Sequence, residues 1–136
     1  MNLFLPVLSL FLFQSTMPGG QHGLLRNAFR TATESVVDNA LTIDPAAPDT
    51  QFAPAMTQLK QSQLNLAQMA ADDRENEIAS ETKNLLFTVS ACHIQAKADP
   101  SKVAVCQPQI DHAAHEVELL INRHKANGSW QDGPPA

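Results

Sequence analysis

The chain has 136 residues and a net charge of −5, so it is long enough for one domain with a modest hydrophobic core. The negative charge argues against a nucleic-acid-binding protein, which needs a basic face to displace counterions from phosphates. Six Phe, one Trp and no Tyr are present, whereas Ala, Leu, Gln, Asn, Glu and Asp are abundant. Because a β-sandwich or barrel would need more aromatic and β-branched residues, we expect an all-α fold.

The first twenty residues carry no charged side chain, and residues 3–13 are apolar except for Ser9. Eleven residues of helix rise about 16 Å, roughly half of a bilayer core, which favours a signal peptide over a transmembrane span. A retained anchor and a buried first helix stay open as alternatives, because no Lys or Arg precedes the apolar stretch and QSTMPGG lacks an A-x-A pattern. An exported protein would be periplasmic or secreted, and it would contact the membrane only through residues 1–20 if they are retained.

The rest of the chain, residues 21–127, is predicted to be one helical domain. Apolar residues recur at helical spacing over residues 22–41, which predicts the first helix of the domain. Residues 42–51 carry two prolines and two aspartates, as is typical of a loop. Pro54 suits the first turn of the next helix, where a missing N–H costs nothing. Residues 55–98 contain neither Gly nor Pro and are compatible with helix throughout.

An acidic run, DDRENE, lies in the middle of this long segment at residues 72–77. Asp72 and Glu75 have the D-x-x-E spacing of a capping box, which would mark a helix start. Because no Gly or Pro marks a break there, we favour one continuous helix over two. The four acids Asp72, Asp73, Glu75 and Glu77 would then form a solvated face or, in a sharper hypothesis, a docking surface for a basic partner.

The last helix is expected to follow Asp99 and Pro100, which suit the N-cap and the first helical position. Its apolar side chains repeat in heptads, as in a coiled coil, at Val103, Cys106, Ile110, Ala113, Val117, Leu120 and His124. The heptad keeps its phase across Pro108, so we expect a kink there and not a helix end. Asn127-Gly128 is a helix stop, and residues 128–136 are expected to form a mobile tail.

Both cysteines are placed symmetrically about the expected turn at residue 99, seven residues before it and seven after it. Two antiparallel helices joined there would bring Cys92 and Cys106 face to face, and a disulfide needs Cα atoms about 4.4–6.8 Å apart. We therefore predict a disulfide between them, with a pair of free thiols as the alternative. Their spacing matches no zinc motif, and no C-x-x-C redox motif is present.

The segment IDHAAHE suggests a second hypothesis. His112, His115 and Glu116 share one side of a helix at spacings of three and four residues, and such a cluster could bind Zn²⁺, Ni²⁺ or Cu²⁺. The alternative is that these three residues simply form a solvated polar face of the helix. No H-E-x-x-H, Glu-x-x-His or C-x-x-C-H motif occurs, so neither a metalloprotease, a di-iron bundle nor a c-type haem is indicated, and we expect no cofactor.

These patterns predict an antiparallel bundle of three or four helices with a disulfide-stapled C-terminal hairpin. No catalytic constellation stands out, so we do not expect an enzyme. The leading hypothesis is a non-enzymatic exported helical protein that acts through protein–protein contacts, with a protein partner or by self-association. It would be a small subunit of an envelope or extracellular assembly. The alternative is a metal- or haem-binding helical module that uses the C-terminal histidines.

Overall fold

The computed structural model describes residues 26–126, and the side chains of residues 26–123. In this part of the chain lie four α-helices and the 3-10 helix η2 (Pro100–Lys102). The α-helices are α2 (Asn27–Thr42), α3 (Asp49–Met69), α4 (Asp73–Ala98) and α5 (Val103–Ala126). The predicted leader of residues 1–20, the predicted tail of residues 128–136 and the side chain of His124 lie outside the described residues. The all-α prediction is confirmed, in its four-helix form.

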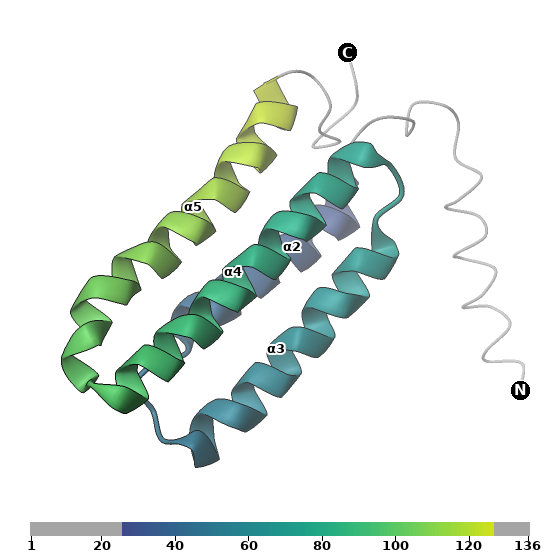
Figure 1. Cartoon of the computed structure of the whole chain (residues 1–136). Helices are drawn as coiled ribbons and strands as arrows, with labels where there is room; N and C mark the ends of the chain where they lie inside the picture. The colour runs from purple at the N-terminus through teal and green to yellow at the C-terminus, as the bar shows by residue number, and fades with distance from the viewer. Residues whose placement is uncertain (1–25, 127–136) are drawn as a thin grey trace, which may run out of the picture.

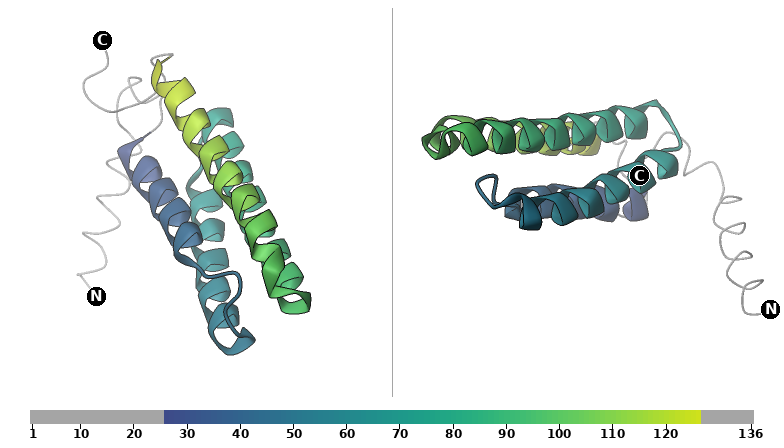
Figure 2. Two further views of the ribbon diagram at one scale, coloured as in Figure 1. Left: turned by 90° about the vertical axis from the view of Figure 1, so that its left-hand side faces the viewer. Right: turned by 60° about the horizontal axis from the view of Figure 1, so that its bottom comes forward.

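Helix α4 occupies the centre of the bundle and contacts α2, α3 and α5 (Figure 1). The right-hand view of Figure 2 shows two layers, one of α4 with α5 and one of α2 with α3. Helix α2 touches each of the other three helices, whereas α3 and α5 lie at opposite corners without contact. Short connections make consecutive helices antiparallel, as an up-and-down bundle requires.

The core forms where the apolar stripes of the helices meet. Its largest fully buried apolar side chains are Phe29, Leu66, Ile78, Leu85 and Ile110. The amide of Gln63 is also buried and donates to the carbonyl of Ala79 and the hydroxyl of Thr82. Both N–H groups of this amide thus have acceptors, so its burial does not leave an unpaired donor that would lower stability.

Helix α5 buries the heptad positions described by the sequence from Cys106 to Leu120, and it runs unbroken through Pro108. Ala114 and Ile121, which lie beside the heptad, are buried as well. The apolar face is therefore wider than a two-helix seam, because α5 packs against both α4 and α2.

The expected continuous helix over residues 55–98 is wrong, because α3 ends at Met69 and α4 begins at Asp73. Asp72 is the N-cap of α4, and its carboxylate accepts a hydrogen bond from the backbone N–H of Glu75 at 2.9 Å. A side-chain cap satisfies one of the four N–H groups that a helix start leaves unpaired. The Asp72 cap therefore marks the start of α4, although no Gly or Pro precedes it.

The loop before α3 is shorter than predicted. Helix α3 begins at Asp49, inside the segment 42–51 that we expected to be a loop. Pro54 is consequently the sixth residue of the helix and not part of its first turn. It cannot donate to the carbonyl of Thr50, so a backbone hydrogen bond is missing there.

The predicted disulfide is present between Cys92 of α4 and Cys106 of α5, with Cα atoms 5.4 Å apart. The turn is the predicted one, because the carboxylate of Asp99 accepts from the backbone N–H and the hydroxyl of Ser101. The C-terminal hairpin is therefore stapled about two turns from its tip. No helix within residues 26–126 has the length and apolar character needed to cross a membrane.

Candidate interaction surface

The three most exposed large apolar side chains of the described residues all lie on the stapled hairpin. Phe87 and Ile94 of α4 are 73% and 67% exposed, and Val105 of α5 is 58% exposed. Phe87 and Ile94 are seven residues apart, so they lie on one face of α4, two turns from each other. This face points away from the stripe that α4 buries, and hence away from α2.

The disulfide shows that Ile94 and Val105 lie at similar positions along the axis of the hairpin. Ile94 follows Cys92 by two residues, Val105 directly precedes Cys106, and the two cysteines lie opposite each other. The two apolar side chains are therefore at nearly the same level on neighbouring helices. Phe87 and Ile94 share one face of α4, and large exposed apolar side chains gathered on one face of a small protein mark a contact site more often than a chance feature.

The charges around these side chains differ from those of the chain as a whole. Lys83, Lys97 and Lys102 lie three or four residues from Phe87, Ile94 and Val105 respectively, and all three lysines are exposed. No acid occupies any position three or four residues from the apolar side chains. We call Phe87, Ile94, Val105 and the three lysines the hairpin face. Lys83 and Lys102 give this face positive charge on a chain of net charge −5, whereas Lys97 forms an ion pair with Asp49 of α3, with Nζ 2.8 Å from Oδ2.

The acidic run does not form the uniform surface that the sequence suggested. Asp73 and Glu77 are exposed, and Asp72 is half-buried as the helix cap. Glu75 is fully buried, so its predicted place on a docking surface is wrong. The reason is an ion pair with Arg26, which lies 49 residues earlier in the chain.

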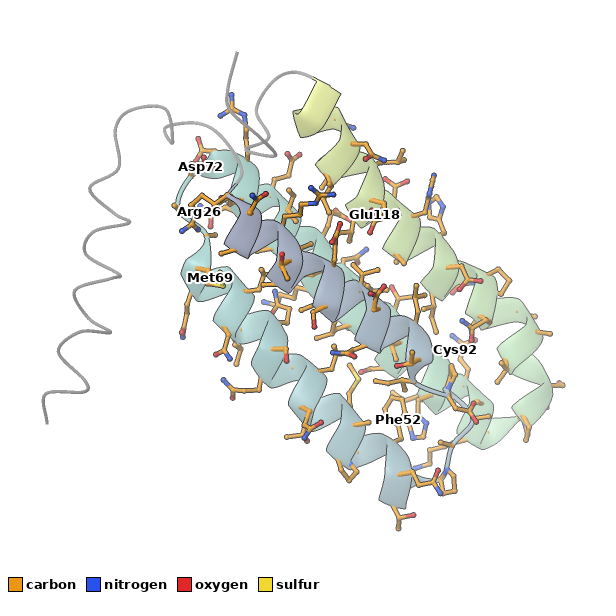
Figure 3. All side chains as sticks on the ribbon, turned by 180° about the vertical axis from the view of Figure 1, so that it is seen from behind. Arg26, Phe52, Met69, Asp72, Cys92 and Glu118 are labelled. Atoms are coloured by element: carbon orange, nitrogen blue, oxygen red, sulfur yellow. A yellow bond between two sulfur atoms is a disulfide. The ribbon has the colours of Figure 1, made fainter. Side chains whose placement is uncertain are left out.

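Arg26 lies at one end of the bundle, close to Met69 and Asp72 (Figure 3), and its contact with Glu75 joins three helices there. The carboxylate Oε1 accepts from Arg26 Nη2 and from the backbone N–H of Ala71, both at 2.8 Å. The other oxygen, Oε2, accepts from Arg26 Nε at 3.2 Å and from the backbone N–H of Arg26 at 3.3 Å. Arg26 Nη2 also donates to the carbonyl of Met69, the last residue of α3. The connection between α3 and α4 is therefore fixed by the residue that caps α2.

The predicted metal ligands are on the surface of α5. His112 Nε2 lies 3.6 Å from Glu116 Oε2, and their side chains are 72% and 43% exposed. His115 is exposed too and lines a shallow groove between α2 and α5. Within the described residues, no three His, Cys, Asp or Glu side chains are arranged to hold a metal ion.

The groove between α2 and α5 is acidic. Burial raises the pKa of Glu118, and the nearby carboxylates of Glu34 and Asp38 raise it further. Asp38, Asp111 and Glu118 line this groove with His115. Like charges at such a helix contact oppose packing when all of them are ionised.

The hairpin face was not predicted from the sequence, because helical periodicity identifies the buried stripe and most residues outside such a stripe are simply solvated. The signal was present in Phe87 and Ile94, which share a seven-residue spacing away from the buried positions Leu85, Val89 and Cys92. Comparisons of the chain with protein-family models, with curated proteins and with solved structures gave no match.

Proposed function

We propose that this is a non-enzymatic exported helical protein that binds another protein through the hairpin face. In this proposal it serves as a small subunit of an envelope or extracellular assembly. The observation that carries the proposal is the exposure of Phe87, Ile94 and Val105 on the one part of the described fold that is covalently cross-linked. A rigid apolar surface binds at a lower entropic cost than a mobile one, because fewer side chains and backbone angles are ordered on binding.

The charges of the hairpin face define the partner. Lys83 and Lys102, which lie near the apolar side chains, favour a partner surface that is apolar at its centre and edged by carboxylates. The rim charges would mainly increase the association rate and make it depend on salt, whereas Phe87 and Ile94 would supply the buried contact. Aromatic and large aliphatic anchors are typical of such contacts.

Export is supported by the disulfide and by the apolar first twenty residues together. Structural disulfides persist in oxidising compartments and are rare in a reducing cytosol. We expect Cys92 and Cys106 to be oxidised in protein taken directly from cells, with a mass two units below that of the reduced chain. Alkylation of both thiols in protein isolated under acid quench would contradict the export proposal.

Site-specific photo-crosslinking tests the binding proposal. A photoreactive phenylalanine analogue is placed at position 87, 94 or 64 of the full chain in its source cells. Leu64 of α3 is the matched control, because it is also apolar and 53% exposed but lies outside the hairpin face. We expect one discrete adduct, with the same partner, from positions 87 and 94 and none from position 64.

Charge reversal then tests the chemistry assigned to the partner. Lys83→Glu with Lys102→Glu should weaken the adduct from position 87 severalfold, and added salt should weaken the wild-type adduct. The proposal is refuted if positions 87 and 94 give no adduct, or if position 64 gives the same adducts in equal yield.

A further inference from the structure

His93 is a nearly buried histidine at the opposite end of the bundle from Arg26, and three segments hold its ring. Its side chain is on α4 and is only 8% exposed. Nδ1 lies 2.9 Å from the carbonyl oxygen of Pro45, in the connection between α2 and α3. Nε2 lies 2.7 Å from Oδ1 of Asp49, the first residue of α3. The ring of Phe52 is stacked on the imidazole, with centroids 3.7 Å apart and planes 4° from parallel.

Both polar partners of this ring are hydrogen-bond acceptors. A backbone carbonyl can only accept, and an ionised carboxylate can only accept. Hydrogen bonds from Lys97 and then from His93 hold the pKa of Asp49 below its ordinary value of 3.8, so this carboxylate is ionised at neutral pH. Each ring nitrogen must therefore donate, and only the imidazolium form carries two N–H groups.

A neutral imidazole cannot make both contacts. With its proton on Nδ1 it keeps the bond to Pro45, but it directs a lone pair at the carboxylate of Asp49. With its proton on Nε2 it keeps Asp49 and directs a lone pair at the carbonyl of Pro45. Two acceptors facing each other at hydrogen-bond distance repel, so one of the two contacts has to open. The bond from Nε2 to the ionised carboxylate of Asp49 is charge-assisted and shorter than the bond to Pro45, so the neutral ring keeps its proton on Nε2 and the contact with Pro45 is the one that opens.

We propose that His93 is a proton-dependent latch, which holds the connection between α2 and α3 against the α4–α5 hairpin and releases it when the ring loses its proton. The charged groups of the cluster are Asp49 of α3 and Lys97 of α4, whose Nζ lies 2.8 Å from the second carboxylate oxygen of Asp49. Helices α2 and α5 contribute no hydrogen bond or ion pair to this ring within residues 26–126.

The segment that moves is the connection, residues 43–48. His93 follows Cys92 directly, so the disulfide fixes the backbone of α4 on the hairpin side of the latch. The connection is held locally by Asp44, which accepts from the backbone N–H groups of Ala46 and Ala47. Pro45 is buried while the latch is closed, and its release would expose both its ring and its carbonyl to water.

Nuclear magnetic resonance of the full chain tests the latch. The ¹⁵N shifts of the His93 ring report whether one or both nitrogens carry protons, and the amides of Ala46 and Ala47 report on the connection. We expect two ring protons in the closed form. We also expect the protection factor of the Ala47 amide, corrected for intrinsic exchange, to fall about tenfold with the same midpoint as the His93 titration.

Two exposed positions provide matched variants that leave the buried ring in place. In Asp49→Asn, the new amide can donate to the lone pair of a neutral Nε2 while Nδ1 still donates to Pro45. The connection should then stay closed in both protonation states, and its response to pH should vanish. In Lys97→Gln, both partners of the ring are kept, so the response should be kept.

The proposal is overturned if His93 titrates while Ala46 and Ala47 do not change, or if the ring carries one proton in the closed form. It is also overturned if Asp49→Asn responds to pH as the wild type does. The crosslinks described above do not enter this test, so the latch and the binding proposal stand or fall separately.

Discussion

Replacing Glu75 by Gln should cost about 3 kcal/mol of unfolding free energy, although the two side chains have nearly the same shape. The carboxylate accepts four hydrogen bonds, two on each oxygen. The amide of Gln has one accepting oxygen and one NH₂ group that can only donate. In either orientation two of the four hydrogen bonds are lost, and the NH₂ group faces two N–H groups that also donate. A bond to a charged group contributes about 1.5–3 kcal/mol. We take the lower value because Arg26 is 36% exposed and can regain water.

Urea denaturation followed by helical circular dichroism measures this loss, with the slope of unfolding free energy against urea checked for constancy. For a domain of this size, about 3 kcal/mol corresponds to a fall in melting temperature of roughly 12 °C or more. Asp73→Asn is the matched control, because it removes the same charge from the same helical turn at an exposed position. It should cost less than about 1 kcal/mol, from the helix dipole alone. Equal losses in the two variants would refute the structural role assigned to Glu75.

Three further outcomes are expected. Reduction of the disulfide, or joint Cys92→Ser and Cys106→Ser, should lower stability by about 3 kcal/mol, because the bond closes a loop of about 15 residues; an unchanged urea midpoint would contradict this. Glu118→Gln should raise the melting temperature at pH 7 but not near pH 4. The folded protein raises the pKa of Glu118 above its ordinary 4.5, so ionisation costs stability as the pH rises from that value; equal melting curves at pH 7 would disprove the effect. Pro54→Ala should stabilise the protein by about 1–3 kcal/mol, since Ala restores the N–H that α3 lacks at this exposed position. A lower urea midpoint would show that Pro54 instead supports the fold.

The sequence was most informative where a structural signal is local. Asp99 and Pro100 define a helix end and a helix start within two residues, and the equal spacing of the cysteines about them then determines their pairing. The buried stripe of α4 was predicted for the same reason, since residues on one helical face are related by a short period. Such features need no knowledge of distant parts of the chain.

The helix break at residues 70–72 was missed because half of its cause is distant. Asp72 supplies the local cap, but Glu75 is buried only because Arg26 reaches it from another helix. Without Arg26, four acids in a run are best explained as solvated. The environment of His93 was out of reach for the same reason, because Pro45, Asp49 and Phe52 approach it only after the bundle has assembled.

The junction at Arg26 also limits how far the chain can be trimmed from its N-terminus. Both the side chain and the backbone N–H of Arg26 donate to Glu75, and its side chain reaches the end of α3. A protease that cut after Arg26 would leave a buried carboxylate without its cation and the connection between α3 and α4 without its tie. Any maturation that preserves this bundle therefore has to cleave before Arg26, which makes that residue the inner boundary for processing.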